Sequence, residues 1–144
     1  MKIDYQNILK KNMINVLKDI LREIKKNDNK AIYQLYITFT TTHKELKIPA
    51  WLKKKYPDEM TIVIEHEYWD LRIFDDNFKI ILSFNDIKVN LSIPFKSVIS
   101  FADANAKFGL KIQENKIKKS SIKINKNTNE KNNVIDFSKF KKSN

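Results

Sequence analysis

The sequence predicts a mainly β fold with one N-terminal α-helix and a disordered C-terminal tail. Short antiparallel strands are expected to form a small curled sheet or open barrel on which the helix packs. Three observations lead to this fold class. Apolar residues recur at helical spacing near the N-terminus, strand-like segments with short polar links fill the middle, and apolar content falls beyond residue 112. The 144 residues fit one domain, expected at 1–113.

The N-terminal segment 4–26 has the pattern of an amphipathic helix. Its apolar residues cover about half of the circumference, whereas one packing surface needs a stripe of only about 100°. We expect either two contacts, one with the sheet and one with a second copy, or a helix buried more deeply in its own core. The apolar residues are Tyr5, Ile8, Leu9, Met13, Ile14, Val16, Leu17, Ile20, Leu21 and Ile24.

Six segments after the helix have the length and the β-branched and aromatic content of strands. The links at 75–77 and 85–86 consist of Asp and Asn, which favour tight turns. Pro94 should end its strand because it has no amide hydrogen to donate. The predicted strands are 32–40, 61–67, 71–75, 78–84, 88–93 and 97–103.

The end of the chain combines a polar segment with a short apolar one. Residues 114–132 are rich in lysine and asparagine and lack aromatic side chains, which predicts a flexible linker. Val134, Ile135, Phe137 and Phe140 then follow within 133–144. Such a segment is typical of a docking peptide that raises the local concentration of a tethered domain at its partner. The alternative is a segment that folds back on its own domain.

The composition argues against several kinds of site. The chain has no cysteine, two histidines, His43 and His66, and a single glycine, Gly109. Disulfides and thiolate zinc sites are therefore excluded, and neither a histidine metal cluster nor a glycine-rich nucleotide loop is expected. The sequence contains no apolar run long enough to predict a membrane span, and no basic segment followed by an apolar one that would predict a secretory leader. We expect a soluble intracellular protein without a cofactor.

The net charge of +11 is concentrated in the tail. Of the 28 basic and 17 acidic residues, ten lysines and three acidic residues lie in 111–144, which leaves 18 basic and 14 acidic residues in 1–110. The part expected to fold is thus only mildly basic. Arg22 and Arg72 are the only arginines, although arginine suits phosphate and base recognition best. Nucleic acid is therefore a weaker expectation than a protein partner.

Catalytic candidates have a simpler explanation. Glu65 and Glu67 lie two residues apart in a predicted strand and could act as paired carboxylates in glycoside hydrolysis, and His66 could transfer protons. A strand face that is exposed to solvent gives the same pattern. No serine or cysteine lies in a recognisable nucleophile motif that could act together with the histidine. We therefore do not expect an enzyme.

Two apolar sets are candidates for binding. In the predicted strand 78–84, Ile81 lies on the face opposite to Phe78 and Ile80, where it is either incidental or the floor of a groove for an extended peptide. Aromatic residues of the strands could stack on single-stranded nucleic acid, or fill the core or a peptide groove. They are Tyr33, Tyr36, Phe39, Tyr68 and Trp69. A barrel that binds single-stranded RNA or DNA is therefore the alternative function.

Four segments are informative together: IPAWLKKKYPDEMTIVIEHEYWDL at 48–71, LSF at 82–84, IPFKSV at 93–98 and FADANAKFGL at 101–110. In order and spacing they resemble the SspB family in the form found in alpha-proteobacteria, over about residues 1–112. The chain departs from the family at two loops. It has Lys44 and Glu45 where a Pro-Gly turn is common, and Asn85 and Asp86 where a Gly-Gly hairpin is common.

The resemblance implies a cytoplasmic, dimeric, non-enzymatic adaptor with an Sm-like open β-barrel and an N-terminal dimerisation helix. Such adaptors bind the ssrA degradation tag and deliver the tagged polypeptide to the ClpX unfoldase of the ClpXP protease. We expect the tag to lie extended against His66, Glu67, Tyr68 and Ile81. The residues expected at the dimer interface are Ile8, Leu9, Met13, Leu17 and Leu21.

In the family, the tail ends in a short apolar and basic motif that docks on the N-terminal domain of ClpX. The segment 133–144 fits such a motif, with Asp136 preceding Phe137 rather than following it. The residues expected to dock are Val134, Ile135, Asp136, Phe137, Phe140, Lys141 and Lys142.

Overall fold

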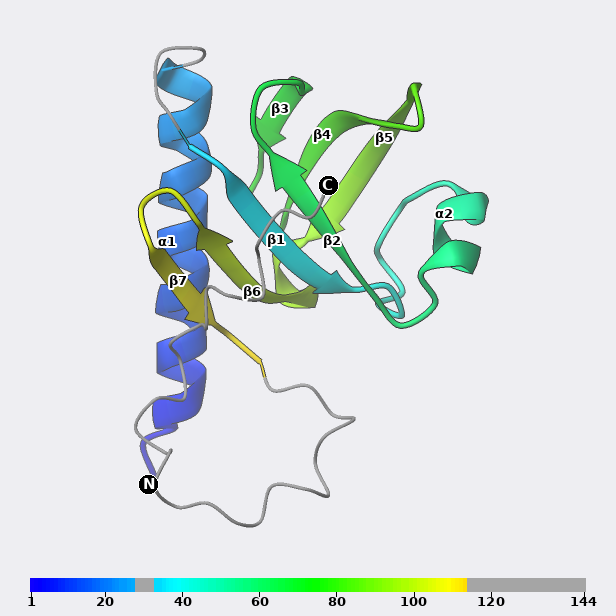
Figure 1. The fold of residues 1–144 in the computed structure, drawn as a ribbon. Coiled ribbons are helices and arrows are strands. Elements are labelled where there is room, and N and C mark those ends of the chain that lie inside the picture. Colours follow the sequence, from blue (N-terminus) through cyan, green and yellow to red (C-terminus); the bar gives the residue numbers. More distant parts are fainter. Residues whose placement is uncertain (28–32, 114–144) are drawn as a thin grey trace.

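The computed structural model describes residues 1–27 and 33–113. Within these residues a long N-terminal helix precedes seven strands, which confirms the predicted mainly β class (Figure 1). The predicted linker and docking motif lie outside the described residues. In chain order the elements are α1 (Tyr5–Asn27), β1 (Leu35–Thr40), α2 (Ala50–Lys55), β2 (Glu59–Ile64), β3 (Trp69–Ile73), β4 (Asn77–Phe84), β5 (Ile87–Pro94), the 3₁₀ turn η2 (Phe95–Ser97), β6 (Val98–Asp103) and β7 (Phe108–Lys111).

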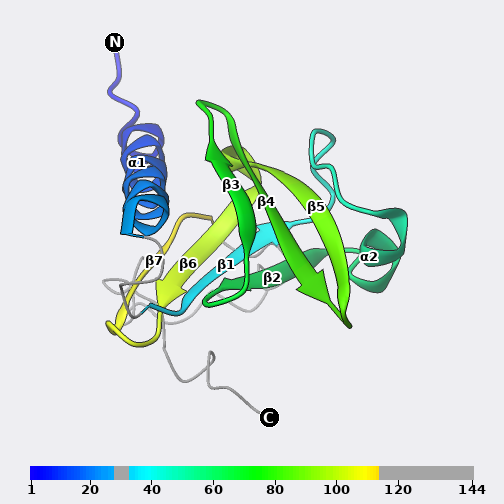
Figure 2. The same cartoon turned by 90° about the horizontal axis from the view of Figure 1, so that it is seen from above.

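The strands form two open antiparallel sheets, whereas the sequence pattern predicted a small curled sheet or an open barrel. A four-stranded sheet has the order β2-β1-β6-β7, and a three-stranded sheet has the order β3-β4-β5. Figure 2 shows the three-stranded sheet lying across the four-stranded one. The difference arises because β1 pairs with β6, which lies far along the chain. The alternation of apolar and polar residues within one strand does not indicate which distant strand it pairs with.

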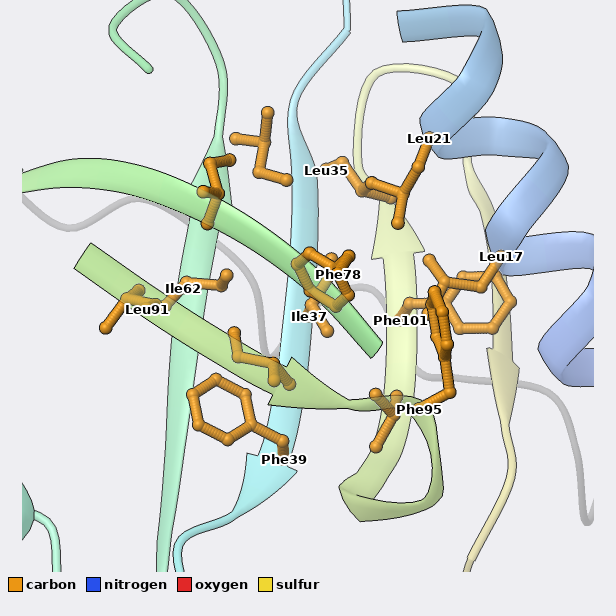
Figure 3. Packing of buried hydrophobic residues seen from close by; sticks show 14 of the residues in the cluster. Leu17, Leu21, Leu35, Ile37, Phe39, Ile62, Phe78, Leu91, Phe95 and Phe101 are labelled. Atoms are coloured by element: carbon orange, nitrogen blue, oxygen red, sulfur yellow. The ribbon is translucent and has the colours of Figure 1, made fainter. Parts of the chain in front are cut away.

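The core lies between the two sheets and one face of α1. Phe39, Phe78 and Phe101 are fully buried, and Leu17 and Leu21 reach this core from the helix (Figure 3). The buried positions of α1 are Met13, Leu17, Leu21 and Ile24, spaced at four, four and three residues as one helical face requires. Burial of this stripe fixes the helix to the sheets.

The first turns of α1 extend past this core. The Asp4 side chain accepts a hydrogen bond from the Asn7 amide at 3.1 Å, which caps the helix start. Tyr5, Ile8 and Leu9 remain 70, 52 and 41% exposed. The five residues expected at a dimer interface thus fall into two groups. Ile8 and Leu9 are open to a partner, whereas the other three, Met13, Leu17 and Leu21, are already covered by the chain's own core.

One turn and one strand end behave as their residue types predict. Asn85 and Asp86, between β4 and β5, have φ values of 54° and 67°. This left-handed backbone explains how Asn-Asp replaces a Gly-Gly hairpin, because both residues tolerate it. Pro94 ends β5 as expected. The predicted strand 61–67 was too long, since β2 ends at Ile64.

Candidate functional site

The face of the three-stranded sheet that points away from the core carries the candidate site. In β4, Phe78, Ile80 and Leu82 are buried in the core. Alternate side chains of a strand point to opposite faces, so Ile81 points outward, as the sequence pattern predicted. It is only partly buried there.

Ile81 lies in a row of side chains that crosses all three strands. Its neighbours in the ladder are Trp69 of β3 and Asn90 of β5. The Lys88 ammonium lies 4.0 Å from the centroid of the Trp69 ring, a cation–π contact. Trp69 is 36% exposed, and the next residue, Asp70, has a φ of 51° where the β3–β4 ladder shifts register. The row therefore offers an aromatic, an aliphatic and an amide group to a ligand.

A groove of about 330 Å³ lies over this face. Three of its side chains are cationic and one is acidic, and the acidic Asp70 accepts a hydrogen bond from Arg72 Nε at 2.9 Å. The groove therefore combines the apolar side chain of Ile81 with a surplus of positive charge. Its lining consists of Lys47, Asp70, Arg72, Lys79, Ile80, Ile81, Asn90, Leu91 and Ser92.

One side of the groove is closed by the segment between β1 and α2. The Lys47 amide donates to the Ser92 carbonyl at 3.0 Å, and the Ser92 amide donates to the Lys47 carbonyl at 3.0 Å. The segment reaches β5 after a turn in which the Leu46 amide donates to the His43 carbonyl. This turn contains Lys44 and Glu45, neither of which has a positive φ, so no glycine is required there. A partly exposed apolar side chain such as Ile81, beside an edge closed in this way, suits an extended peptide held by its side chains.

The family model described as stringent starvation protein B, SspB, matches residues 8–143. The chain belongs to the SspB family. A comparison with curated proteins found no match. SspB membership implies a protease adaptor for ssrA-tagged substrates of ClpXP, and such an adaptor is not an enzyme.

Within this SspB chain, the residues expected to bind the tag are not all brought together. Ile81 lines the groove, whereas His66, Glu67 and Tyr68 lie in the connection between β2 and β3 and are not part of the groove lining. Tyr68 is partly buried against the core, and the His66 side chain is 86% exposed. Trp69, which sequence reasoning did not assign to the tag site, is the aromatic residue that neighbours Ile81.

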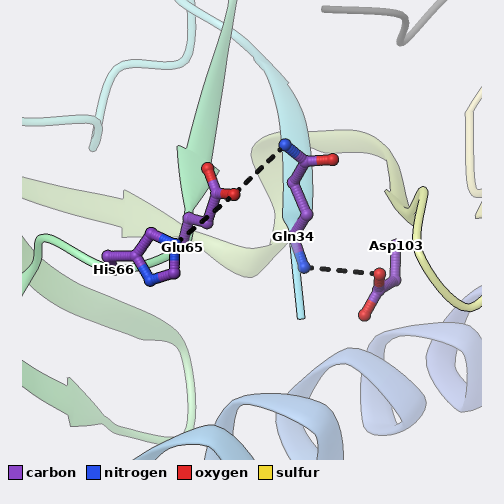
Figure 4. A network of polar contacts seen from close by, with 4 residues as sticks. All are labelled: Gln34, Glu65, His66 and Asp103. Atoms are coloured by element: carbon purple, nitrogen blue, oxygen red, sulfur yellow. Dashed lines mark hydrogen bonds and ion pairs between the residues drawn. The ribbon is translucent and has the colours of Figure 1, made fainter. Parts of the chain in front are cut away.

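The connection between β2 and β3 is tied by a small polar network to Gln34, the residue that precedes β1 (Figure 4). Gln34 Nε2 donates to Glu65 Oε2 at 3.3 Å, and the Gln34 amide donates to Asp103 Oδ1 at 3.3 Å. His66 Nε2 lies 3.9 Å from Glu65 Oε2. Glu65 thus has a structural partner. The suggested pair of Glu65 and Glu67 on one strand face was wrong, because the strand has already ended.

The aromatic set proposed for nucleic-acid stacking does not form a surface. Phe39 and Tyr36 are buried, at 0 and 8% exposed, and Tyr33 and Tyr68 pack partly against the core. Of the five aromatic side chains, only that of Trp69 is exposed. A stacking platform needs several open rings, so this observation weighs against single-stranded nucleic acid as the ligand.

Within 1–27 and 33–113, no three side chains of the kinds that bind metals come together. None of the helices described there has the length and apolar content needed to cross a bilayer.

Proposed function

We propose that this chain is an adaptor of the alpha-proteobacterial SspB form, which acts in the cytoplasm as a homodimer. Residues 1–113 form the domain for tag binding and dimerisation, and its two sheets correspond to an Sm-like open barrel. Residues 114–132 are the flexible linker, and 133–144 dock on the N-terminal domain of ClpX. Neither nucleic acid nor a membrane is part of this proposal. The family match supports it, because the match extends from the helix almost to the end of the tail.

The observation that carries the proposal is the groove around Ile81. Its apolar floor is of a size to hold one or two side chains of an extended peptide, and Trp69 widens the apolar surface. Lys47, Arg72 and Lys79 make the rim attractive to carboxylates of the bound peptide. We propose that the ssrA tag lies along this face and reaches Tyr68, His66 and Glu67 beyond Trp69.

The direct test is fluorescence anisotropy of a labelled ssrA-tag peptide, titrated with the full chain and with a form truncated after Gln113. Both forms should bind with the same Kd, because the groove lies wholly within the described residues. Only the full chain should accelerate degradation of a tagged substrate by ClpXP, since the tether supplies effective concentration. Absence of tag binding by both forms would refute the proposed function.

The positive rim gives a smaller effect that can be measured in the same assay. Lys79→Ala should weaken binding about two- to fivefold and reduce its dependence on salt, because an exposed charge contact contributes about 0.2–1 kcal/mol. Lys54→Ala on α2 is the matched control, since Lys54 is exposed and lies outside the groove. Equal effects of the two substitutions would show that only net charge matters and would remove Lys79 from the site.

The proposed dimer uses one flank of α1. Tyr5 and Leu9 are exposed, Val16 and Ile20 are only partly buried, and the spacing of these residues places them on one side of the helix. The flank lies beside the buried stripe of Met13 and Leu17. A second copy of the same flank would cover these apolar side chains in a symmetric contact.

A further inference from the structure

A second and larger groove lies on the other flank of α1, away from the proposed dimer contact. Its volume is about 870 Å³, and it runs between the helix, the β3–β4 turn and η2. None of its residues lines the groove around Ile81. Its lining consists of Asn7, Lys10, Lys11, Ile14, Asn15, Lys18, Glu45, Asp75, Asp76, Pro94, Phe95, Lys96, Ile112 and Gln113.

The groove has an apolar floor between rims of opposite charge. Ile14, Pro94, Phe95 and Ile112 provide the apolar side chains. The helix carries three lysines along one rim, and Lys18 Nζ lies 5.2 Å from the centroid of the Phe95 ring. Three acidic residues lie opposite, in the turn after β1 and in the β3–β4 turn, namely Glu45, Asp75 and Asp76. A ligand that fits must therefore combine apolar, basic and acidic side chains.

The chain itself leaves the domain at this groove. The Gln113 side-chain amide donates to the Lys96 carbonyl at 3.0 Å and to the Val98 carbonyl at 2.7 Å, and the Gln113 backbone amide donates to the Ile99 carbonyl. These bonds fix the last described residue in the groove lining. Residues 114–144 therefore start at the rim of the groove.

We propose that the segment 134–142 binds this groove of its own chain. Val134, Ile135, Phe137 and Phe140 match the apolar floor, Lys139, Lys141 and Lys142 match the acidic rim, and Asp136 matches the lysines of α1. The 20 residues from 114 to 133 connect the two parts. A flexible chain of that length has a root-mean-square span of roughly 25 Å, enough to return to the same domain.

The tether makes a weak contact sufficient. A short flexible connection gives an effective concentration on the order of millimolar, so a contact with a Kd of that order is occupied about half of the time. A docked segment is covered, and an unfoldase that binds the same residues must first displace it. Self-docking would thus set a resting state of the adaptor. This consequence rests on the proposed role of the segment in unfoldase docking, whereas the contact itself does not.

The contact is tested on full-length protein without tag or unfoldase, so its outcome is independent of the proposed function. A labelled peptide with the sequence of 133–144 is titrated against the wild-type chain and against the variant Phe137→Glu, Phe140→Glu. The variant should bind the peptide, because its own segment no longer occupies the groove. The wild-type chain should bind it severalfold more weakly, because its own segment competes.

Two further variants make the result specific. Asn133→Glu with Ser143→Glu adds the same charge to the tail outside the apolar residues and should behave like the wild-type chain. Adding Asp75→Lys and Asp76→Lys to the Phe137→Glu, Phe140→Glu variant should remove peptide binding, because the acidic rim is then reversed. Hydrogen exchange of the amides at 95–96 and 112–113 should be slower in the wild-type chain than in the Phe137→Glu, Phe140→Glu variant. Equal exchange, or no peptide binding by that variant, would overturn the inference.

Discussion

Replacing Ile81 by glutamate is expected to abolish measurable binding of the ssrA-tag peptide while leaving the fold intact. Burying an apolar side chain of this size against a ligand contributes about 1.5–3 kcal/mol, and each 1.4 kcal/mol changes an affinity tenfold. The new carboxylate must also lose water when a peptide covers it, and it neutralises the nearby cationic rim. Together these effects should lower the affinity about 100-fold or more.

The fold should tolerate this change because Ile81 points out of the sheet and is only partly buried. Anisotropy with the labelled tag peptide gives the affinity, and urea denaturation gives the free energy of unfolding. Ile87→Glu is the matched control, since Ile87 lies on the same sheet, is 52% exposed and is not part of the groove. Tag affinity in Ile81→Glu equal to that of Ile87→Glu would remove Ile81 from the binding site.

Leu17→Ala should have the largest effect on stability, because Leu17 is fully buried and joins α1 to the sheets. Truncating a buried leucine to alanine leaves a cavity and lowers the free energy of unfolding by about 2–5 kcal/mol. The total free energy of unfolding of a domain of this size is about 5–15 kcal/mol, so the substitution would remove a substantial fraction of the stability. Urea denaturation of the full chain measures the change.

Leu9→Ala is the control, since it is the same substitution on the same helix at a residue that is 41% exposed. It should leave the unfolding free energy of dilute protein nearly unchanged and weaken dimerisation in sedimentation experiments. In Leu17→Ala the loss should be present at every protein concentration. A loss below about 1 kcal/mol in Leu17→Ala would contradict the packing of α1 described above.

Local patterns predicted most of the secondary structure of the described residues. The long helix, the central strands and the Asn85–Asp86 turn follow from spacing and residue type. The helix α2 was missed because six residues are too few for a helical period to be recognised. The strand β7 was missed because it has four residues, one of which is Gly109, and pairs only with β6. The formation of α2 and of β7 depends on tertiary contacts, which cannot be inferred from the local sequence.

The candidate site was only partly predictable for a related reason. Alternation along one strand was enough to place Ile81 on the outer face. The position of Trp69 beside it depends on the register between β3 and β4, which shifts next to Asp70. His66 and Glu67 were assigned to a strand because the alternation of apolar and polar residues continues past Ile64. In the structure, β2 ends at Ile64. Side chains from different strands could be combined only once their pairing was known.

The backbone pairing of Lys47 with Ser92 also bears on how cargo would leave the adaptor. At this point of the β5 edge both amides and both carbonyls are already used, so a peptide over Ile81 cannot lengthen the sheet there. A strand added to an edge and pulled along its length must break several hydrogen bonds together. A peptide held by side chains on the face of a sheet yields one contact at a time. We therefore expect cargo to slide off under low mechanical force, leaving the adaptor folded for another round.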